Sequence, residues 1–156
     1  METYAYILRR VAERIGCPPV QVITKRPGVQ AVYRITTYYP DGRACDTVAT
    51  LVCSGLEEIS LETVYSGRFG NQPLLRRLDI ASYTAFTQVL TPSLFDKLPD
   101  QPDIPTYGVD LCLIERGAGS FVKGIIFSPQ RANLPPYSTL VEVVRAYLPE
   151  ALREIK

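Results

Sequence analysis

The side chains that most often perform nucleophilic or acid–base chemistry are scarce in this chain of 156 residues. It contains no histidine, so no serine or cysteine has an imidazole base, and catalysis of the Ser-His or Cys-His kind is excluded. Lys25 and Lys123 would have to be buried to act as Schiff-base lysines, and their neighbours do not suggest burial. The sequence therefore predicts no catalytic residue of these classes.

Carboxylates offer a second route to catalysis, because glycoside hydrolysis needs only two acids at a set separation. The pair Glu57-Glu58 and the nearby Glu62 occupy predicted turn and strand positions, where charged side chains normally face water. Asp96, Asp100 and Asp103 fall in or beside a proline-rich loop that lacks the central glycine and final glutamate of a calcium loop. We expect these acids to be solvated, and an enzyme function is disfavoured.

The four cysteines, Cys17, Cys45, Cys53 and Cys112, are scattered without a Cys-x-x-Cys pair. Without histidine, this spacing removes the usual zinc frameworks, and we expect no metal or other cofactor. Cys45 and Cys53 fall on one face of a single predicted strand, roughly 26 Å apart, which is too far for a disulfide. Free, mostly buried thiols are predicted, in agreement with a reducing cytoplasm.

A loop with two glycines, Ser66 to Pro73, is the remaining feature that could bind something. A glycine-rich loop cradles phosphate when a helix begins directly after it, but Leu74 to Asp79 reads as extended. The pattern predicts a connection between two strands with an exposed tip, where Phe69 is either tucked under the loop or presented as a hydrophobic anchor. The candidate partner-binding residues are Tyr65, Ser66, Gly67, Arg68, Phe69 and Gly70.

Composition limits the class of protein. Hydrophobic residues make up 46% of the chain, which is enough to bury the core of one domain covering residues 1–156. Seventeen basic and sixteen acidic residues are spread along the chain for a net charge of +1, so no field favours nucleic acid or a membrane surface. No apolar run is long enough to span a membrane, and no export signal is visible. We expect a soluble cytoplasmic protein.

The first third of the chain predicts a helix and a hairpin. Apolar residues at three- and four-residue spacing indicate an amphipathic helix over residues 3–15, which Gly16 ends. Weak alternation over Val20 to Lys25 indicates a short strand. Two segments rich in β-branched residues and tyrosine, Val29 to Tyr39 and Ala44 to Cys53, flank a Pro-Asp-Gly turn and predict a hairpin. Its tyrosines and Arg34 permit an RNA-stacking interpretation, which the near-zero charge disfavours.

The rest of the chain predicts further strands and two helices. Alternation predicts a strand over Ile59 to Tyr65, and Asp79 can cap a helix over residues 80–90, which Pro92 interrupts. Residues 106–115 and 120–128 form a second predicted hairpin. Ser138 is expected to cap a last helix, whose apolar stripe continues to Ile155 past a kink at Pro149.

Helices and strands do not alternate as they do in parallel-sheet proteins, so the order predicts an α+β fold. We expect an antiparallel sheet of about six to seven strands, with N-terminal, central and C-terminal helices covering one face. Residues 1–57 supply the first helix and hairpin, and residues 58–156 supply the remainder.

The second part of the chain, roughly residues 58–156, resembles the emfourin family of small protein inhibitors of thermolysin-like metallopeptidases. The matching features are Ser66-Gly67-Arg68-Phe69-Gly70 after a strand, a helix with Phe86 and Leu90, Leu94-Phe95-Asp96-Lys97-Leu98-Pro99, Pro102-Asp103 before Tyr107, a strand pair about Gly117-Ala118-Gly119, and a closing helix led by Leu140 and Val141. The resemblance implies a protein that binds another protein, blocking a peptidase cleft with the strand and loop near Ser66 to Gly70.

Three functional hypotheses follow. The first is a non-enzymatic protein-binding domain, with a metallopeptidase as one possible partner. The second is a small-ligand or hydrolytic site between the sheet and the helices, lined by Tyr33, Tyr65 and Tyr107. The third is a homo-oligomeric structural subunit or adaptor of a larger complex, joined through an uncovered sheet face or edge strand.

Overall fold

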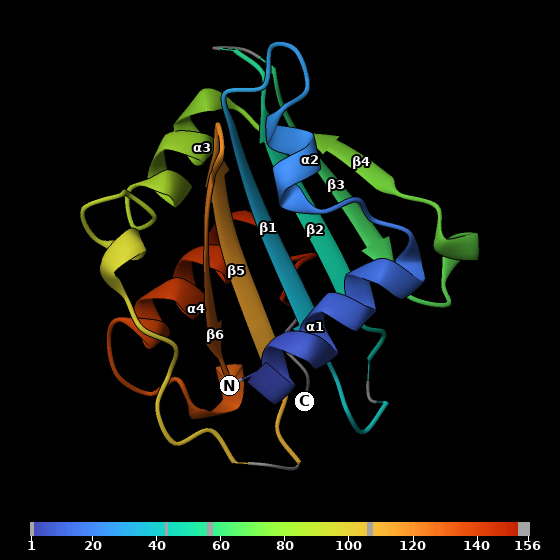
Figure 1. The fold of residues 1–156 in the computed structure, drawn as a ribbon, viewed down its shortest axis with the longest axis vertical. Helices are drawn as coiled ribbons and strands as arrows, with labels where there is room; N and C mark the ends of the chain where they lie inside the picture. Colours follow the sequence, from blue (N-terminus) through green and yellow to red (C-terminus); the bar gives the residue numbers. More distant parts are fainter. Residues whose placement is uncertain (1, 43, 56–57, 106–107, 153–156) are drawn as a thin grey trace.

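The computed structural model describes residues 2–42, 44–55, 58–105 and 108–152 of the chain. Within these ranges, the predicted strand segments pair into one antiparallel sheet in the order β4-β3-β2-β1-β5-β6 (Figure 1). The strands are β1 (Ala31–Tyr38), β2 (Thr47–Cys53), β3 (Ile59–Tyr65), β4 (Leu74–Arg77), β5 (Leu111–Ala118) and β6 (Phe121–Phe127). This arrangement confirms the α+β fold and an antiparallel sheet of about the expected size.

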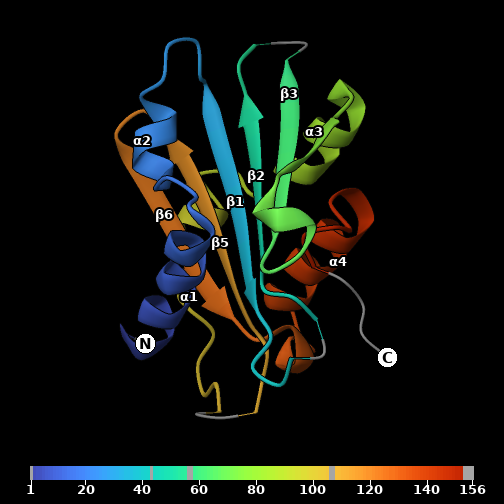
Figure 2. The same cartoon turned by 90° about the vertical axis from the view of Figure 1, so that its right-hand side faces the viewer.

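Helices cover both faces of the sheet. Helices α1 (Glu2–Ile15) and α2 (Val20–Thr24) lie on one face, and α3 (Ile80–Thr87) and α4 (Tyr137–Tyr147) lie on the other (Figure 2). The expectation of a single covered face is therefore wrong. The physical reason is visible in β1 and β2, where Val32 and Val48 point to the second face and are as fully buried as Ile35 and Ala49 on the first.

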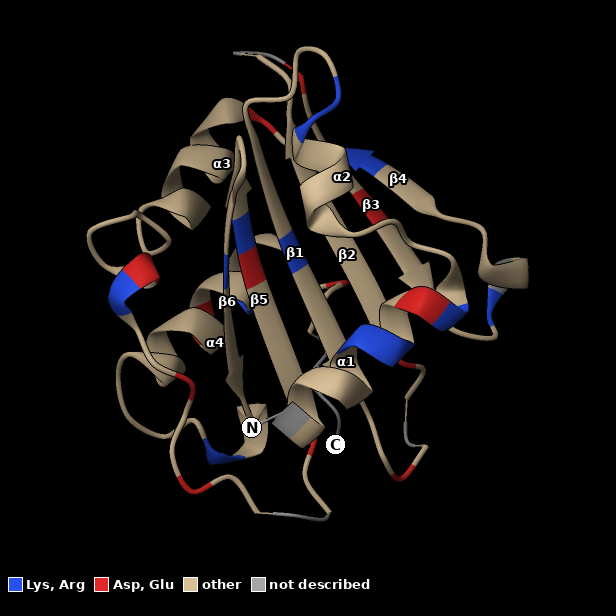
Figure 3. Ribbon diagram, in the orientation of Figure 1, with Lys and Arg blue, Asp and Glu red and all other residues tan. Residues whose placement is uncertain are grey.

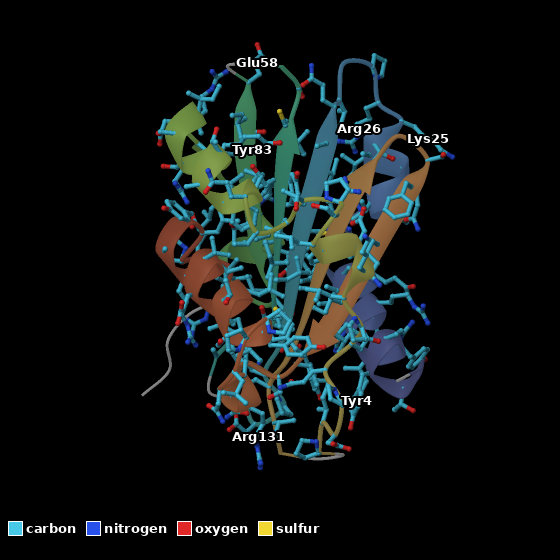
Figure 4. All side chains as sticks on the ribbon, turned by 90° about the vertical axis from the view of Figure 1, so that its left-hand side faces the viewer. Tyr4, Lys25, Arg26, Glu58, Tyr83 and Arg131 are labelled. Carbon is cyan, nitrogen blue, oxygen red and sulfur yellow. The ribbon has the colours of Figure 1, made fainter. Side chains whose placement is uncertain are left out.

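The largest core cluster lies between the sheet and helices α3 and α4. The ring of Phe86 is fully buried and meets Tyr33 of β1 edge to face, with centroids 5.8 Å apart. Tyr83 makes a similar edge contact with Tyr33 at 6.2 Å, and its side chain lies between α3 and the sheet (Figure 4). Burial raises the pKa of both tyrosines, because the ionised phenolate is disfavoured there.

The α2 segment is helical, so the strand prediction for Val20 to Lys25 is wrong. Val20 and Ile23 are three residues apart, which puts both on one side of a helical turn, where they pack with Val32 in a cluster of their own. The β-branched residues of this segment fit either structure locally, and contact with the sheet decided in favour of the helix.

Helix caps were predicted with mixed success. Asp79 caps α3 as expected, because its carboxylate accepts from the Ser82 backbone nitrogen at 3.1 Å and from the Ser82 hydroxyl at 2.7 Å. Ser138 does not cap α4, which begins at Tyr137 with Pro136 in the capping position. Leu148, Ala151 and Leu152 remain in the core after α4 ends, and Ile155 lies outside the described residues.

The two hairpins form as predicted, with shorter strands. In the first, β1 and β2 pair antiparallel with Tyr33 opposite Leu51, and in the second, Ala118 of β5 lies opposite Phe121 of β6. Residues 106–107, at the predicted start of the second hairpin, lie outside the described residues. The strand β2 begins at Thr47, so Cys45 does not share a strand with Cys53 as the sequence had suggested.

All four cysteines have free thiols, and Cys53 and Cys112 are buried. Burial raises the pKa of Cys112 to about 12, which keeps this thiol protonated. Among the described residues, no group of cysteines and carboxylates is arranged to hold a metal ion. None of the helices in the described part of the chain has the length and apolarity needed to cross a bilayer.

A glycine on β5 allows α2 to pack closely on the sheet. A Cβ atom at Gly117 would lie 2.6 Å from Val20 Cγ1 and 2.8 Å from Thr24 Cγ2, and both side chains are β-branched and stiff. We expect Gly117→Ala to lower the free energy of unfolding by about 1–3 kcal/mol. Urea denaturation measures this change.

The control for Gly117→Ala is Ser120→Ala, at an exposed position of the β5–β6 turn, which should leave the unfolding midpoint nearly unchanged. The cost of Gly117→Ala should also shrink in a Val20→Ala background, since the shorter side chain makes room. An equal cost in both backgrounds would show that α2 does not pack on Gly117 in solution.

Candidate functional site

The loop between β3 and β4 is held by hydrogen bonds that its backbone N–H groups donate. Ser66 N donates to Asp46 O at 2.8 Å, and Gly67 N donates to the side-chain oxygen of Asn71 at 2.7 Å. The connection then passes through a short 3₁₀ turn, Phe69–Asn71, in which Gly70 and Asn71 have positive φ angles. These bonds give the loop a defined shape although it projects from the sheet.

The six predicted partner-binding residues do not all lie at the tip. Gly67, Arg68 and Gly70 are exposed, so the exposed tip was correctly predicted. Tyr65 is half-buried and its hydroxyl donates to Glu150 O at 3.1 Å, so this side chain points toward the segment after α4. Ser66 is also half-buried. The side chain of Phe69 lies outside what the structure describes.

Strand β4, which follows the loop, is one edge of the sheet. It pairs with β3 alone, and Leu78 N donates to Ile59 O just beyond the strand. Hydrogen-bonded and non-hydrogen-bonded positions alternate in an antiparallel pair. The register, with Arg76 opposite Leu61, therefore turns the backbone groups of Leu75 and Arg77 outward, away from the sheet.

The outward-facing part of β4 also carries exposed apolar surface. Leu75 is 75% exposed and Leu74 is 44% exposed, although both belong to a strand of a well-packed sheet. Exposed leucines are unusual on a strand whose outer side has no neighbouring strand, because such an edge can pair with other chains. Outward-facing backbone groups with no partner among the described residues, beside an exposed leucine, make this edge a candidate binding surface.

The opposite edge of the sheet, strand β6, is partly covered by another segment of the chain. Over the C-terminal half of β6, Ile126 O accepts from Gln101 N at 2.9 Å, and Ile126 N donates to the Asp100 carboxylate at 2.8 Å. The side chain of Gln101 accepts from Ser128 N at 2.8 Å, just past the strand. The segment containing residues 100–101 thus closes part of this edge, and β4 is the more open of the two.

An ion pair fastens β4 to the end of the chain. The guanidinium of Arg76 donates to both oxygens of Glu150, at 2.8 and 2.9 Å, and to Tyr147 O at 3.0 Å. Burial is the largest single effect on Glu150 and would raise its pKa, but the hydrogen bond from Arg76, a backbone hydrogen bond and the charge of Arg76 together lower the pKa. The same bond raises the pKa of Arg76. The pair holds β4 against the α4 side of the molecule.

Two exposed arginines make the edge basic. Arg68 in the loop and Arg77 at the end of β4 have no carboxylate within ion-pair distance among the described residues, whereas the charge of Arg76 is matched by Glu150. Basic segments lie at the end of β4 and in the loop before it (Figure 3). An acidic partner segment would be attracted to this edge.

Tyr33 and Tyr65, two of the three tyrosines predicted to line a pocket between the sheet and the helices, have different partners among the described residues. Tyr33 is packed against Phe86 and Tyr83 in a filled core, Tyr65 binds Glu150, and Tyr107 lies outside the described residues. Two small cavities lie instead on the α1–α2 side of the sheet, with volumes of ≈ 240 and ≈ 160 Å³. Arg34 and Cys17 line both of them.

Sequence reasoning missed the edge strand and the Arg34 cavities. The sequence does contain a signal for the second, since Arg34 interrupts a strand of otherwise β-branched and aromatic residues. The signal for the edge strand is weaker, because Leu74-Leu75 also fits a buried strand.

No protein-family model matches this chain, and no curated protein is significantly similar to it.

The Arg76–Glu150 pair should control how firmly β4 is held. We expect Glu150→Gln to speed amide exchange of Arg76 and Leu78 by about two- to fivefold at neutral pH, because a half-exposed ion pair is worth up to about 1 kcal/mol. Hydrogen–deuterium exchange measures this effect. The matched control is Glu13→Gln, which breaks an exposed pair with Arg10 on α1.

The effect of Glu150→Gln on amide exchange in β4 should depend on pH. The folded-state pKa of Glu150 is lowered, so the stabilisation is complete above the unfolded pKa of about 4.3 and is lost as the pH falls through the folded value. The ratio of exchange rates between Glu150→Gln and the unchanged protein should approach one in that acidic range. A ratio independent of pH would show that the charge of Glu150 does not hold β4.

Proposed function

We propose that this protein is a non-enzymatic protein-binding domain, whose binding surface is strand β4 together with the Ser66–Pro73 loop. The observation that carries the proposal is the outward-facing backbone of Leu75 and Arg77 beside a leucine that is 75% exposed. The chain also has no histidine, which removes the commonest catalytic base. The free thiols support placing it in the reducing cytoplasm.

The binding mode we propose is strand addition. An extended segment of the partner would donate to and accept from the backbone of Leu75 and Arg77, as peptides do when they extend a sheet. The Leu75 side chain supplies apolar contact, and Arg77 and Arg68 favour acidic side chains in the bound segment. The ion pair between Arg76 and Glu150 keeps the edge in place before the partner arrives.

A finer proposal concerns the kind of partner. The resemblance to the emfourin family suggests a thermolysin-like metallopeptidase, with the strand and loop near Ser66 to Gly70 blocking its cleft. The loop is suited to this role, because the Gly67–Asn71 and Ser66–Asp46 hydrogen bonds fix its shape without a partner. Pairing of two β4 edges in a homodimer is the competing use of the same surface.

Peptide selection tests the strand-addition proposal. Random ten-residue peptides displayed on phage should yield acidic sequences with alternating apolar residues. Bound synthetic peptide should slow amide exchange at Leu75 and Arg77, whose nitrogens face outward, and change Leu74 and Arg76 little. Slowed exchange at those two amides with rising protein concentration alone would indicate the homodimer instead.

Two substitutions sharpen the test. Leu75→Pro removes an outward-facing N–H without breaking a bond to β3, so it should weaken peptide binding at least about tenfold with little loss of stability. Arg77→Glu should weaken acidic peptides and spare neutral ones. Phe121→Ala, at a 48% exposed position on the other edge strand, is the matched control. Unchanged affinity in both β4 variants would refute binding at this edge.

The peptidase proposal has its own measurement. The purified protein is titrated into thermolysin while cleavage of a short peptide substrate is followed. We expect inhibition, which Arg68→Ala should weaken while the melting temperature stays nearly constant, because Arg68 is exposed. If thermolysin retains full activity at a large excess of the protein, the inhibitor proposal fails for this enzyme and strand addition can still hold.

A further inference from the structure

Arg34 is a buried cation at the centre of the sheet. It lies in the middle of β1, on the face that α1 and α2 cover, and is only 3% exposed. Its Nε donates to the Thr50 hydroxyl at 3.0 Å, and Nη1 donates to Pro18 O at 2.6 Å. Both acceptors are uncharged. Among the described residues, no carboxylate lies within 4.0 Å of this guanidinium.

Two other arginines of the chain are more exposed, and each has a carboxylate partner. Arg76 donates to both oxygens of Glu150, and Arg116 donates to both oxygens of Asp96. Arg116 is 8% exposed against 3% for Arg34. Arg34 is therefore more deeply buried than Arg116 but has no carboxylate partner of its own among the described residues. This is unusual, because burying a charge is costly unless it is paired.

The strand register places two carboxylates in the same row as Arg34. Glu115 lies opposite Arg34 on β5, and Glu62 lies opposite Thr50 on β3. Acidic bands on β5 and β3 flank a basic band on β1 (Figure 3). Burial lowers the pKa of Arg34, and these carboxylates act against that shift only from a distance. The row therefore compensates the charge partially, and the hydrogen bonds to Thr50 and Pro18 use two of the five guanidinium N–H groups.

The space beside Arg34 is large enough for a small molecule. The larger cavity, ≈ 240 Å³, lies under the connection between α1 and α2 and is lined by Arg34, the Thr50 hydroxyl and a second cation, Arg26. Arg26 projects from the segment after α2, on the α2 side of the sheet (Figure 4). Ile15, Ile23 and Val48 form its apolar wall.

We propose that this cavity binds a small organic monocarboxylate. The carboxylate accepts hydrogen bonds from Arg34, and the short hydrocarbon body packs against Ile15, Ile23 and Val48. Asn71 and Pro73 of the Ser66–Pro73 loop also line this cavity, so the site adjoins the proposed protein-binding surface. It does not use the outward-facing backbone of β4, and carboxylate binding can therefore be tested independently of strand addition. The site gives Arg34 a binding role in addition to its hydrogen bonds to Thr50 and Pro18.

The charges and size of the cavity define the ligand class. Among the residues that line the cavity, Arg26 and Arg34 contribute two positive charges and Glu62 one negative charge, while Glu115, opposite Arg34, lies outside the lining. This small positive excess favours a monoanion over a phosphate dianion. The apolar wall favours a ligand with a hydrocarbon part, which sulfate and nitrate lack. Pockets for drug-sized ligands are typically about 300–1,000 Å³, so this cavity suits a molecule of only a few carbon atoms.

Isobutyrate is the probe that tests the proposal, and isobutyramide is its neutral control of the same shape. In a ¹⁵N-correlation NMR titration, isobutyrate should bind with a dissociation constant near about 1 mM and shift the amides of Gly16, Cys17 and Thr50. Isobutyramide should bind at least about tenfold more weakly, since it carries no charge for Arg34. The melting temperature should rise with isobutyrate alone.

Variants separate the cavity from general attraction of anions. Arg34→Lys keeps the charge but loses the planar fork, and should weaken isobutyrate at least about tenfold. Arg26→Gln, at an exposed position, should weaken isobutyrate binding about two- to fivefold. This variant replaces Arg34→Lys in the test if Arg34→Lys does not fold. Arg131→Lys, at an exposed position in the short helix after β6, should change nothing. Absence of saturation by about 20 mM, equal binding of the amide, or shifts confined to amides distant from the cavity would overturn the proposal.

Discussion

Burial of strand β1 on both faces is the constraint on which the structure depends. This strand pairs along both of its edges, with β2 and β5, and all its central residues are buried. A strand in this position needs an apolar layer on each side, and the chain supplies one from its N-terminal helices and one from α3 and α4. Both layers have to form for the sheet to be covered.

The same sheet must end somewhere, and its two ends differ. A loop containing Asp100 and Gln101 satisfies outward-facing backbone groups at and just beyond the C-terminal half of β6. No segment in the described part of the chain covers strand β4 in this way, and Leu75 is exposed to water. Proteins usually protect edge strands against unwanted pairing, so an edge left open with an ordered loop beside it is consistent with selective pairing to a partner.

The α1–α2 layer differs from the α3–α4 layer in chemistry. The α3–α4 side is filled by aromatic and aliphatic side chains such as Phe86, Phe95 and Phe127. The other side includes Arg34, Thr36 and Thr50, all nearly inaccessible to water. Arg34 also holds the connection between the two helices through Pro18 O. One side of the sheet therefore provides most of the apolar core, and the other combines packing with a polar centre.

Local patterns determined the strands, the turns and the Asp79 cap, because alternation, Pro-Asp-Gly chemistry and capping act between near neighbours. They also predicted an exposed tip in the Ser66–Pro73 loop. Only the tertiary structure decided that Val20 to Thr24 is a helix, that both sheet faces are covered, and that β4 is an edge. Those outcomes depend on which segments meet in space. Gly117 is one example, because its missing Cβ leaves room for Val20 and Thr24 of α2 to pack on β5, a contact that local sequence does not reveal.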